Sequence, residues 1–234
     1  MNLIKFDRKR VYQVWAKQHF KFILAFLLLT NFATYSISNW TVEKTNNEPQ
    51  RLYLLETAEP FVHNVGDFEQ KVRKISRKLG VPPEWLMAVM HSESRFDASV
   101  ANHKGSGATG LIQFMPTTAK DFDITTAKLR NLNHVEQLDY VYAYFDAKRK
   151  QYKQYESLTD LYLAVLYPKA LGEDYCYTMY AAPSKTYEMN KGLDVNKDNR
   201  VTVQDIDQFL KGKYMTAYGT EKSSFWGKIL TSVR

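Results

Sequence analysis

The stretch from Val81 to Pro116 constrains the fold of this chain more than any other. It opens with Pro82 and Pro83, which suit the first turn of a helix because a residue there has no intrahelical use for its N–H. Three apolar residues and a glutamate then recur at i, i+3, i+4 and i+7: Leu86, Val89, Met90 and Glu93. The spacing predicts a helix with these four residues on one face, and the apolar three predict that the face is buried.

Glu93 is the candidate catalytic residue. A carboxylate on a core-facing stripe is costly to ionise, so the pKa of Glu93 is expected to be raised. A carboxyl group in such an environment is still protonated near neutral pH and can act as a general acid. The alternative is a Glu93 at a frayed helix end, turned to water or paired with Arg95 or Lys104.

The second half of the stretch, residues 105–115, carries three glycines among small residues. Such a backbone turns tightly or lets a ligand approach closely. Gln113 can both donate and accept hydrogen bonds, which suits a sugar hydroxyl or acetamido group, and Met115 adds a soft apolar contact. We therefore expect a cleft between the Glu93 helix and this segment.

Three motifs in this order resemble the soluble lytic transglycosylase family of the lysozyme superfamily. They are Glu93-Ser-x-Phe96, Ser106-x-Ala108-x-Gly110-Leu-Ile-Gln-Phe-Met-Pro116 and Ala164-Val-Leu-Tyr167. The run from 137 to 194 is similar to the phage virion-associated members. The family's Asn-Ala-Gly after the tyrosine is replaced here by residues 168–172, which leaves the details of that subsite open.

The resemblance implies a mainly α, lysozyme-like (goose-type/transglycosylase) domain that cleaves peptidoglycan glycan strands with one glutamate. Glu93 would protonate the glycosidic oxygen between N-acetylmuramic acid and N-acetylglucosamine. It would then take the proton of the C6 hydroxyl, which closes a 1,6-anhydro ring. The substrate's own acetamido group would replace a second carboxylate, and no cofactor is expected for catalysis.

The same resemblance implies that Tyr167 orients Glu93. It implies that the sugar is bound by four further residues: Ser94, Ser106, Gln113 and Met115. Two alternatives remain open. A hydrolytic lysozyme (muramidase) of the same fold would use a second carboxylate, with Asp97 the first candidate because it follows Glu93 by four residues. A non-catalytic wall-binding or virion structural protein is expected to have lost the glutamate.

Residues 194–205 follow the EF-hand calcium pattern, with oxygen-bearing side chains at loop positions 1, 3, 5, 9 and 12. The predicted metal ligands are Asp194, Asn196, Asp198, the Arg200 carbonyl and Asp205. Position 6 lacks the usual glycine and position 12 the longer glutamate, so the sequence favours a weak, structural calcium site. The alternative is a polar turn that caps the following helix. A calcium sensor would need paired EF-hands, and only one such loop is found.

The net charge of +7 is concentrated at the N-terminus. Residues 1–21 carry +5, residues 22–38 carry no charge, and the rest of the chain carries only +2. The remainder is therefore not a basic domain, and nucleic-acid binding is disfavoured. The apolar run 22–38 predicts a cleaved signal segment or, in better agreement with its long basic flank, a retained transmembrane helix in a lipid bilayer.

The positive-inside rule then places residues 1–21 in the cytoplasm and the catalytic domain outside. We expect a single-pass protein of the bacterial inner membrane or of a membrane-containing virion, with its domain on the exterior or periplasmic side. The predicted organisation is a basic tail, the apolar segment, a linker at 39–60, the transglycosylase domain at 61–210 and a C-terminal tail at 211–234. The single cysteine, Cys176, excludes an intramolecular disulfide and is expected to be buried.

Overall fold

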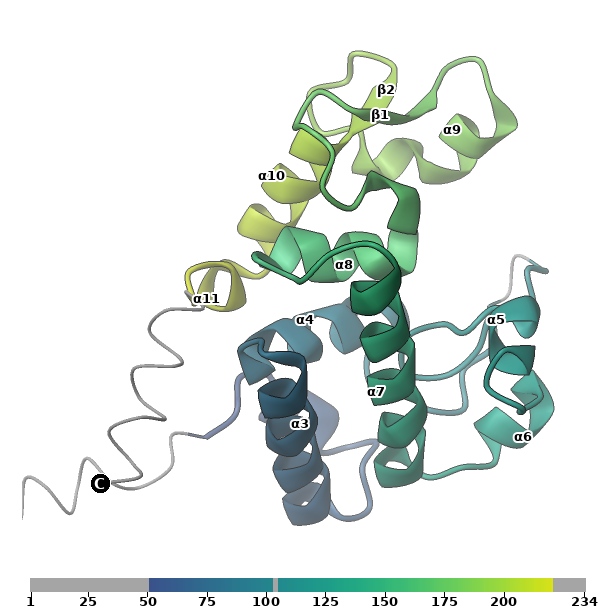
Figure 1. Cartoon of the computed structure of the whole chain (residues 1–234), viewed down its shortest axis with the longest axis vertical. Coiled ribbons are helices and arrows are strands. Elements are labelled where there is room, and N and C mark those ends of the chain that lie inside the picture. Colours follow the sequence, from purple (N-terminus) through teal and green to yellow (C-terminus); the bar gives the residue numbers. More distant parts are fainter. Residues whose placement is uncertain (1–50, 103–104, 221–234) are drawn as a thin grey trace, which may run out of the picture. The chain divides into compact units, whose positions relative to one another are not determined.

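The computed structural model describes residues 51–102 and 105–220, which form a mainly helical unit with one small sheet (Figure 1). Its α-helices are α2 (Leu55–Ala58), α3 (Val65–Leu79), α4 (Pro83–Ser94), α5 (Pro116–Lys120), α6 (Thr126–Arg130), α7 (His134–Gln151), α8 (Leu158–Leu166), α9 (Lys185–Asn190), α10 (Val203–Lys213) and α11 (Met215–Tyr218). Two 3-10 turns, η1 (Pro168–Ala170) and η2 (Lys191–Leu193), and two strands, β1 (Thr178–Ala181) and β2 (Arg200–Thr202), complete it.

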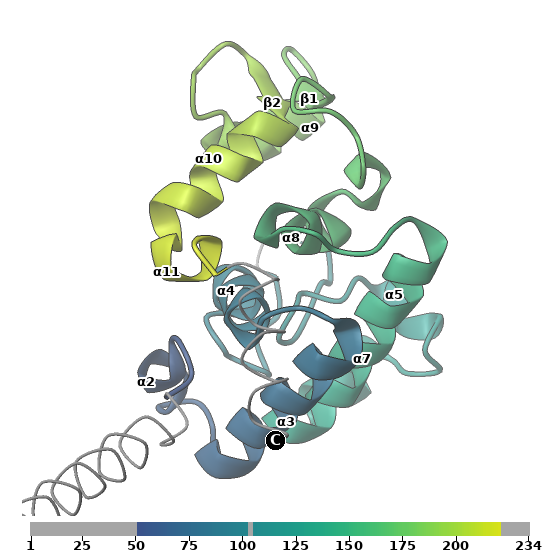
Figure 2. The ribbon, with the colours of Figure 1, turned by 60° about the vertical axis from the view of Figure 1, so that its left-hand side comes forward.

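Helix α4 lies inside this unit and packs against α3, α8 and α11 (Figure 2). The predicted buried face is confirmed, because Leu86, Val89 and Met90 are fully buried. Burial is not limited to that face, however, since every residue from 85 to 90 is buried. A helix that is apolar on all sides must be enclosed by other elements, and here three helices enclose it.

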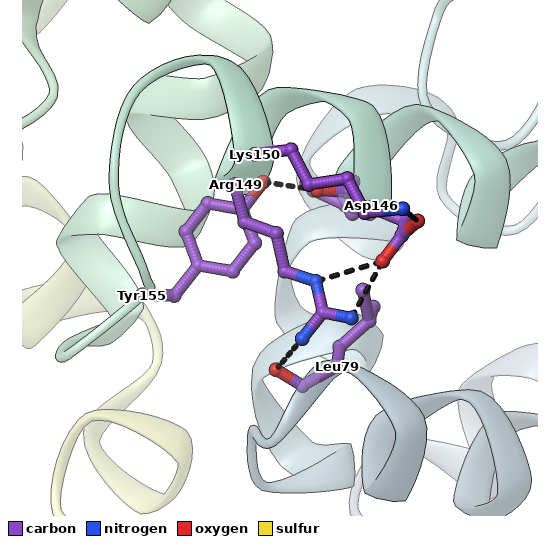
Figure 3. A network of polar contacts seen from close by, with 6 residues as sticks. Leu79, Asp146, Arg149, Lys150 and Tyr155 are labelled. Carbon is purple, nitrogen blue, oxygen red and sulfur yellow. Dashed lines mark hydrogen bonds and ion pairs between the residues drawn. The ribbon is translucent and has the colours of Figure 1, made fainter.

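Helices α3 and α7 lie side by side, and a polar cluster joins their C-terminal ends (Figure 3). Arg149 on α7 donates to the Leu79 carbonyl at the end of α3 at 3.5 Å, and its other nitrogens donate to Asp146 at 2.8 and 2.5 Å. The hydroxyl of Tyr155 donates to the Phe145 carbonyl at 2.8 Å, which holds the chain after α7 against that helix. These contacts hold the C-terminal ends of the two helices together.

The C-terminal third of the described chain adds the small sheet and α10. Strands β1 and β2 are antiparallel, with Tyr180 opposite Val201. Helix α10 packs on α8, and the short α11 packs on α4, where the Trp85 indole N–H donates to the carbonyls of Ala217 and Thr220 at 3.0 and 3.2 Å. Residues after 210 are thus part of the core that surrounds the Glu93 helix.

Two predicted boundaries and one predicted burial are wrong. Residues 51–60, expected in the linker, belong to the compact unit, and their apolar side chains are buried in the core. The domain continues past 210, because Tyr214 and Ala217 are 1% and 0% exposed. Cys176 is exposed rather than buried.

The predicted apolar segment 22–38 lies outside the described residues. Of the helices in the described ranges, none has both the length and the apolar character needed to cross a membrane.

Candidate active site

Glu93 lies on the last turn of α4, next to the point where the helix stops. Arg95 and Phe96 follow with φ of 54° and 68°, a left-handed conformation that ends the helix and is uncommon for residues with a side chain. The buried Phe96 ring makes an edge contact with Phe68 of α3, at 6.4 Å between ring centroids. Packing therefore holds this turn and fixes the position of the carboxyl group.

Burial raises the pKa of Glu93 to about 7, and the positive charge of Lys213 on α10 opposes this rise. At neutral pH a substantial fraction of the carboxyl groups therefore keeps its proton. A carboxyl group with this pKa can donate a proton and later accept one at the same pH, which is the requirement for an acid that also serves as a base.

Three buried tyrosines that the sequence did not single out, Tyr144, Tyr162 and Tyr214, interact with Glu93. The pKa values of Tyr144 on α7 and Tyr162 on α8 are raised first by burial and then by the charge of Glu93. Tyr144 donates to the Ala164 carbonyl at 2.6 Å, and the Tyr162 hydroxyl lies 3.4 Å from the Ser92 hydroxyl. The charge of Glu93 therefore acts on a buried tyrosine of each of these two helices.

The glycine segment is held against α4 and α7 by a buried amide. Gln137 on α7 is fully buried; its Oε1 accepts the Leu111 N–H at 3.0 Å, and its Nε2 donates to the Ala98 carbonyl at 2.6 Å. Gly110 has a φ of 79°, and a Cβ atom there would lie 2.6 Å from Oε1 of Gln137. The glycine is required because the amide occupies the space of a side chain. A lone glutamine within a helix gives no sequence signal for this role.

The hydroxyl groups of Ser94 and Ser106 form hydrogen bonds within the protein. The Ser94 hydroxyl donates to the Met90 carbonyl at 3.1 Å and to the Leu111 carbonyl at 3.0 Å, so it ties the end of α4 to the glycine segment. The Ser106 hydroxyl accepts the Ala108 N–H at 3.3 Å. The predicted contacts of both serines with substrate stay predictions.

Gln113 and Met115 line a pocket of about 210 Å³ at the edge of the glycine segment. Gln113 has a φ of 53°, and its Nε2 donates to the Gly110 carbonyl at 3.1 Å, which sets the orientation of its amide. Met115 is 44% exposed and stands directly before α5. The pocket is lined by Ile112, Gln113, Phe114, Met115, Thr118, Tyr144, Lys148, Val165 and Pro168.

Tyr167 follows α8 directly and contacts the small sheet. Its ring meets that of Tyr180 edge to face, with the centroids 5.6 Å apart. Among the described residues, no hydrogen bond joins Tyr167 to Glu93. The predicted role of Tyr167 in orienting Glu93 therefore stays a prediction, whereas Tyr144 and Tyr162 interact electrostatically with the carboxyl group.

Asp97 is not on the Glu93 helix, because the chain leaves α4 at residue 95. Its Oδ1 accepts the backbone N–H and the hydroxyl of Ser99 at 2.8 and 2.7 Å. Its charge raises the pKa of His134, in part offsetting the larger effect of burial, and it is not among the causes of the raised pKa of Glu93. The carboxylate of Asp97 is thus hydrogen-bonded to Ser99 and interacts electrostatically with His134.

The loop 194–205 has the backbone expected of an EF-hand-like loop. Asn199 at its sixth position has a φ of 70°, the conformation that glycine usually supplies. Val201 at the eighth position is fully buried in β2. Thr202 at the ninth position and Asp205 at the twelfth form a capping box at the start of α10.

The carboxylates of this loop accept hydrogen bonds from the chain itself. Asp194 accepts the N–H groups of Asp198 and Asn199 at 3.2 and 3.0 Å. One oxygen of Asp205 accepts the Val195 N–H at 3.1 Å, and the other belongs to the capping box. Among the residues that the structure describes, no group of three or more His, Cys, Asp or Glu side chains is arranged to hold a metal ion.

The side chains of this loop are joined by hydrogen bonds within the loop. Asn196 and the Arg200 backbone take part in the same pattern, because Oδ1 of Asn196 accepts the Asp198 N–H and Oδ1 of Asp198 accepts the Arg200 N–H. The calcium site stays a prediction.

A buried carboxylic acid with a raised pKa can act as the general acid that protonates a leaving oxygen when a glycosidic bond is cleaved. Residues 70–166 match the family described as the transglycosylase SLT domain. This segment holds α4, the glycine segment and α7, so this part of the chain is similar to transglycosylase SLT domains. The family supports peptidoglycan transglycosylase activity in general. The similarity to phage members stays a prediction.

Proposed function

We propose that this protein is a peptidoglycan lytic transglycosylase that cleaves the β-1,4 bond between N-acetylmuramic acid and N-acetylglucosamine and leaves a 1,6-anhydro product. One observation carries the proposal: within a transglycosylase SLT domain, Glu93 is a carboxyl group with a pKa of about 7. No other carboxylate is among the causes of that raised pKa.

The surroundings of Glu93 favour a single-carboxylate mechanism over hydrolysis with two. Glycosidases with two carboxylates hold them about 5 to 9.5 Å apart around the scissile bond. A second carboxylate so close would raise the pKa of Glu93 by repulsion. Among the described residues, the charge found to act on this pKa is that of Lys213, which lowers it. Asp97, the first candidate for the second group, binds Ser99 instead.

The proposed reaction uses the Glu93 carboxyl group twice, first as an acid and then as a base. Glu93 donates its proton to the glycosidic oxygen as the bond to C1 of the muramic acid breaks, and the acetamido oxygen of that sugar stabilises C1. The carboxylate then removes the proton of the C6 hydroxyl, whose oxygen bonds to C1. Glu93 is protonated again and no water is consumed, and the burial that raises the pKa of Glu93 suits a step that must exclude water.

The location of the enzyme is part of the proposal. The basic residues 1–21 and the uncharged run 22–38 support export of the domain on a retained membrane anchor, in a bacterial inner membrane or a membrane-containing virion. Either location would place the domain next to the cell wall.

Release of soluble fragments from purified peptidoglycan by the wild-type chain and by Glu93→Gln tests whether Glu93 is the acid. The variant keeps the shape of the side chain but has no proton to donate at any pH, so release should fall at least a hundredfold. Glu84→Gln is the matched control, because Glu84 lies in the first turn of the same helix. Equal release by Glu93→Gln and wild type would refute the assignment.

A further inference from the structure

The pocket beside the glycine segment contains a single charged side chain. Of the nine described residues that line it, only Lys148 on α7 carries a charge. The others are apolar, aromatic, or neutral and polar. With a volume of about 210 Å³, the pocket is smaller than the ~300 to 1,000 Å³ usual for whole small-molecule ligands. It therefore suits one sugar ring or one substituent of a sugar.

Lys148 is half-buried and has no carboxylate partner among the described residues. Its ammonium group lies over the rings of Tyr144 and Tyr152, at 5.5 and 5.9 Å from their centroids. It donates one long hydrogen bond, of 3.4 Å, to the Gln151 side chain. A partly buried ammonium group that lies over aromatic rings can still donate hydrogen bonds to an anion.

Unlike Lys148, two neighbouring lysines are paired with carboxylates. Lys150, two residues further along α7, forms an ion pair with Asp146 at 2.6 Å, and Lys153 pairs with Asp160 at 3.5 Å. Lys148 thus lines the pocket without a carboxylate partner among the described residues, and can bind an external anion there.

The pocket adjoins the catalytic acid. Tyr144 lines the pocket, and its pKa is raised first by burial and then by the charge of Glu93. Leu111, one residue before the pocket wall begins at Ile112, accepts the hydrogen bond of Ser94 at the end of α4. A glycan with its scissile bond at Glu93 can therefore place a substituent of an adjacent sugar in this pocket.

We propose that Lys148 is a specificity-determining residue that binds a carboxylate on the lactyl-peptide substituent of muramic acid. The proposal rests on the proposed function, and it makes carboxylate-bearing glycan the preferred substrate over neutral glycan. Gln113 can bind an acetamido group in the same pocket, while Val165 and Pro168 offer an apolar wall. The carboxylate has two sources: the lactyl group of peptide-free glycan, or the stem peptide of intact strands.

The test compares Lys148→Met, which keeps an unbranched apolar chain, with Lys148→Arg, which keeps the charge, and with the control Lys150→Met. Each variant is assayed for kcat and KM on soluble peptide-bearing strands and on strands freed of peptide by an amidase. Dissociation constants of both substrates and of neutral N-acetylglucosamine oligomers are measured with the same substitutions in a Glu93→Gln chain. Thermal unfolding reports whether each variant is folded.

Lys148→Met should raise KM and the dissociation constant about tenfold for a carboxylate-bearing strand, with kcat little changed, because the contact acts on substrate and transition state alike. Binding of neutral oligomers should not change, Lys148→Arg should restore most of the loss, and Lys150→Met should resemble wild type. If Lys148→Met weakens binding only of amidase-treated strands, the lactyl carboxylate is the bound group. If it weakens binding only of peptide-bearing strands, the bound carboxylate belongs to the stem peptide.

Equal losses for neutral and carboxylate-bearing glycan, or no loss for either strand, would overturn the role of Lys148 while cleavage by wild type left the proposed function standing. Failure of wild type to cleave any strand would reject the proposed function. In that case the binding constants still decide whether Lys148 recognises a carboxylate.

Discussion

At the scale of single residues, two opposing effects set the proton affinity of Glu93. Burial raises its pKa, and the ammonium group of Lys213 lowers it. Lys213 lies at the end of α10, over the rings of Phe209 and Tyr214 at 5.2 Å from each centroid. The aromatic contacts hold a cation near the acid, so the acid is weaker than a free glutamate but still able to lose its proton.

The pH dependence of catalysis tests this balance. Glu93 must be protonated to act, so kcat/KM of the wild type should fall as the pH rises through about 7. Lys213→Met removes the charge that lowers this pKa, so the fall should move to higher pH by roughly half a unit to one unit. Lys211→Met, an exposed neighbour on α10, is the control. An unchanged profile, or a fall that moves to lower pH, would contradict the role of Lys213.

At the scale of elements, the glycine segment depends on one buried amide. Gln137 bonds the Leu111 N–H on one side and the carbonyls of Ala98 and Leu129 on the other, so a single side chain joins three parts of the chain. The glycines were visible in the sequence as a sign of a tight turn. The sequence did not show why residue 110 must be glycine, because Gln137 lies next to it only in the folded chain.

Gly110→Ala should therefore lower the free energy of unfolding by about 1–3 kcal/mol, since the new methyl group meets Oε1 of Gln137 in a left-handed backbone conformation. Gly212→Ala is the matched control. Gly212 lies in helix α10 and a Cβ there meets nothing within 4 Å, so the change should be neutral or stabilising by up to about 1 kcal/mol. Urea unfolding measures both, and equal stability of the two variants would contradict the close packing at Gly110.

The loop 194–205 is a second element whose stability can be tested. Asp205 is 1% exposed and accepts hydrogen bonds from Val195 and from Thr202, so Asp205→Ala leaves buried donors without a partner. The variant should lose about 1–3 kcal/mol of unfolding free energy in EDTA. A loss seen only when calcium is added would show that Asp205 acts through a bound ion and not through the capping box.

At the level of the whole molecule, the sequence predicted the features that depend on residues close together in the chain. The helical spacing and the prolines identified α4 and its buried face, and the motif identified Glu93. The tyrosines around the acid, Tyr144 and Tyr162, looked like ordinary core residues, because their relation to Glu93 arises only when α7 and α8 pack around α4.

The limits of the domain were missed for a related reason. Residues 51–60 and 211–218 form short elements of four residues or the end of a longer helix, which have weak periodicity. Tyr214 and Ala217 are buried because the chain after α10 folds back and packs on α4, as the bonds from Trp85 to the α11 region illustrate. The catalytic unit therefore includes the segment that supplies Lys213.

In the proposed reaction one carboxylate performs both proton transfers, and the C6 hydroxyl, not water, attacks C1. Mass spectrometry of the fragments released from peptidoglycan in ¹⁸O-labelled water distinguishes the two nucleophiles. The expected products carry a 1,6-anhydro end, are lighter by one water than hydrolysis products and contain no label. Labelled reducing ends would contradict the proposed reaction, and would show that the acid works with an activated water molecule.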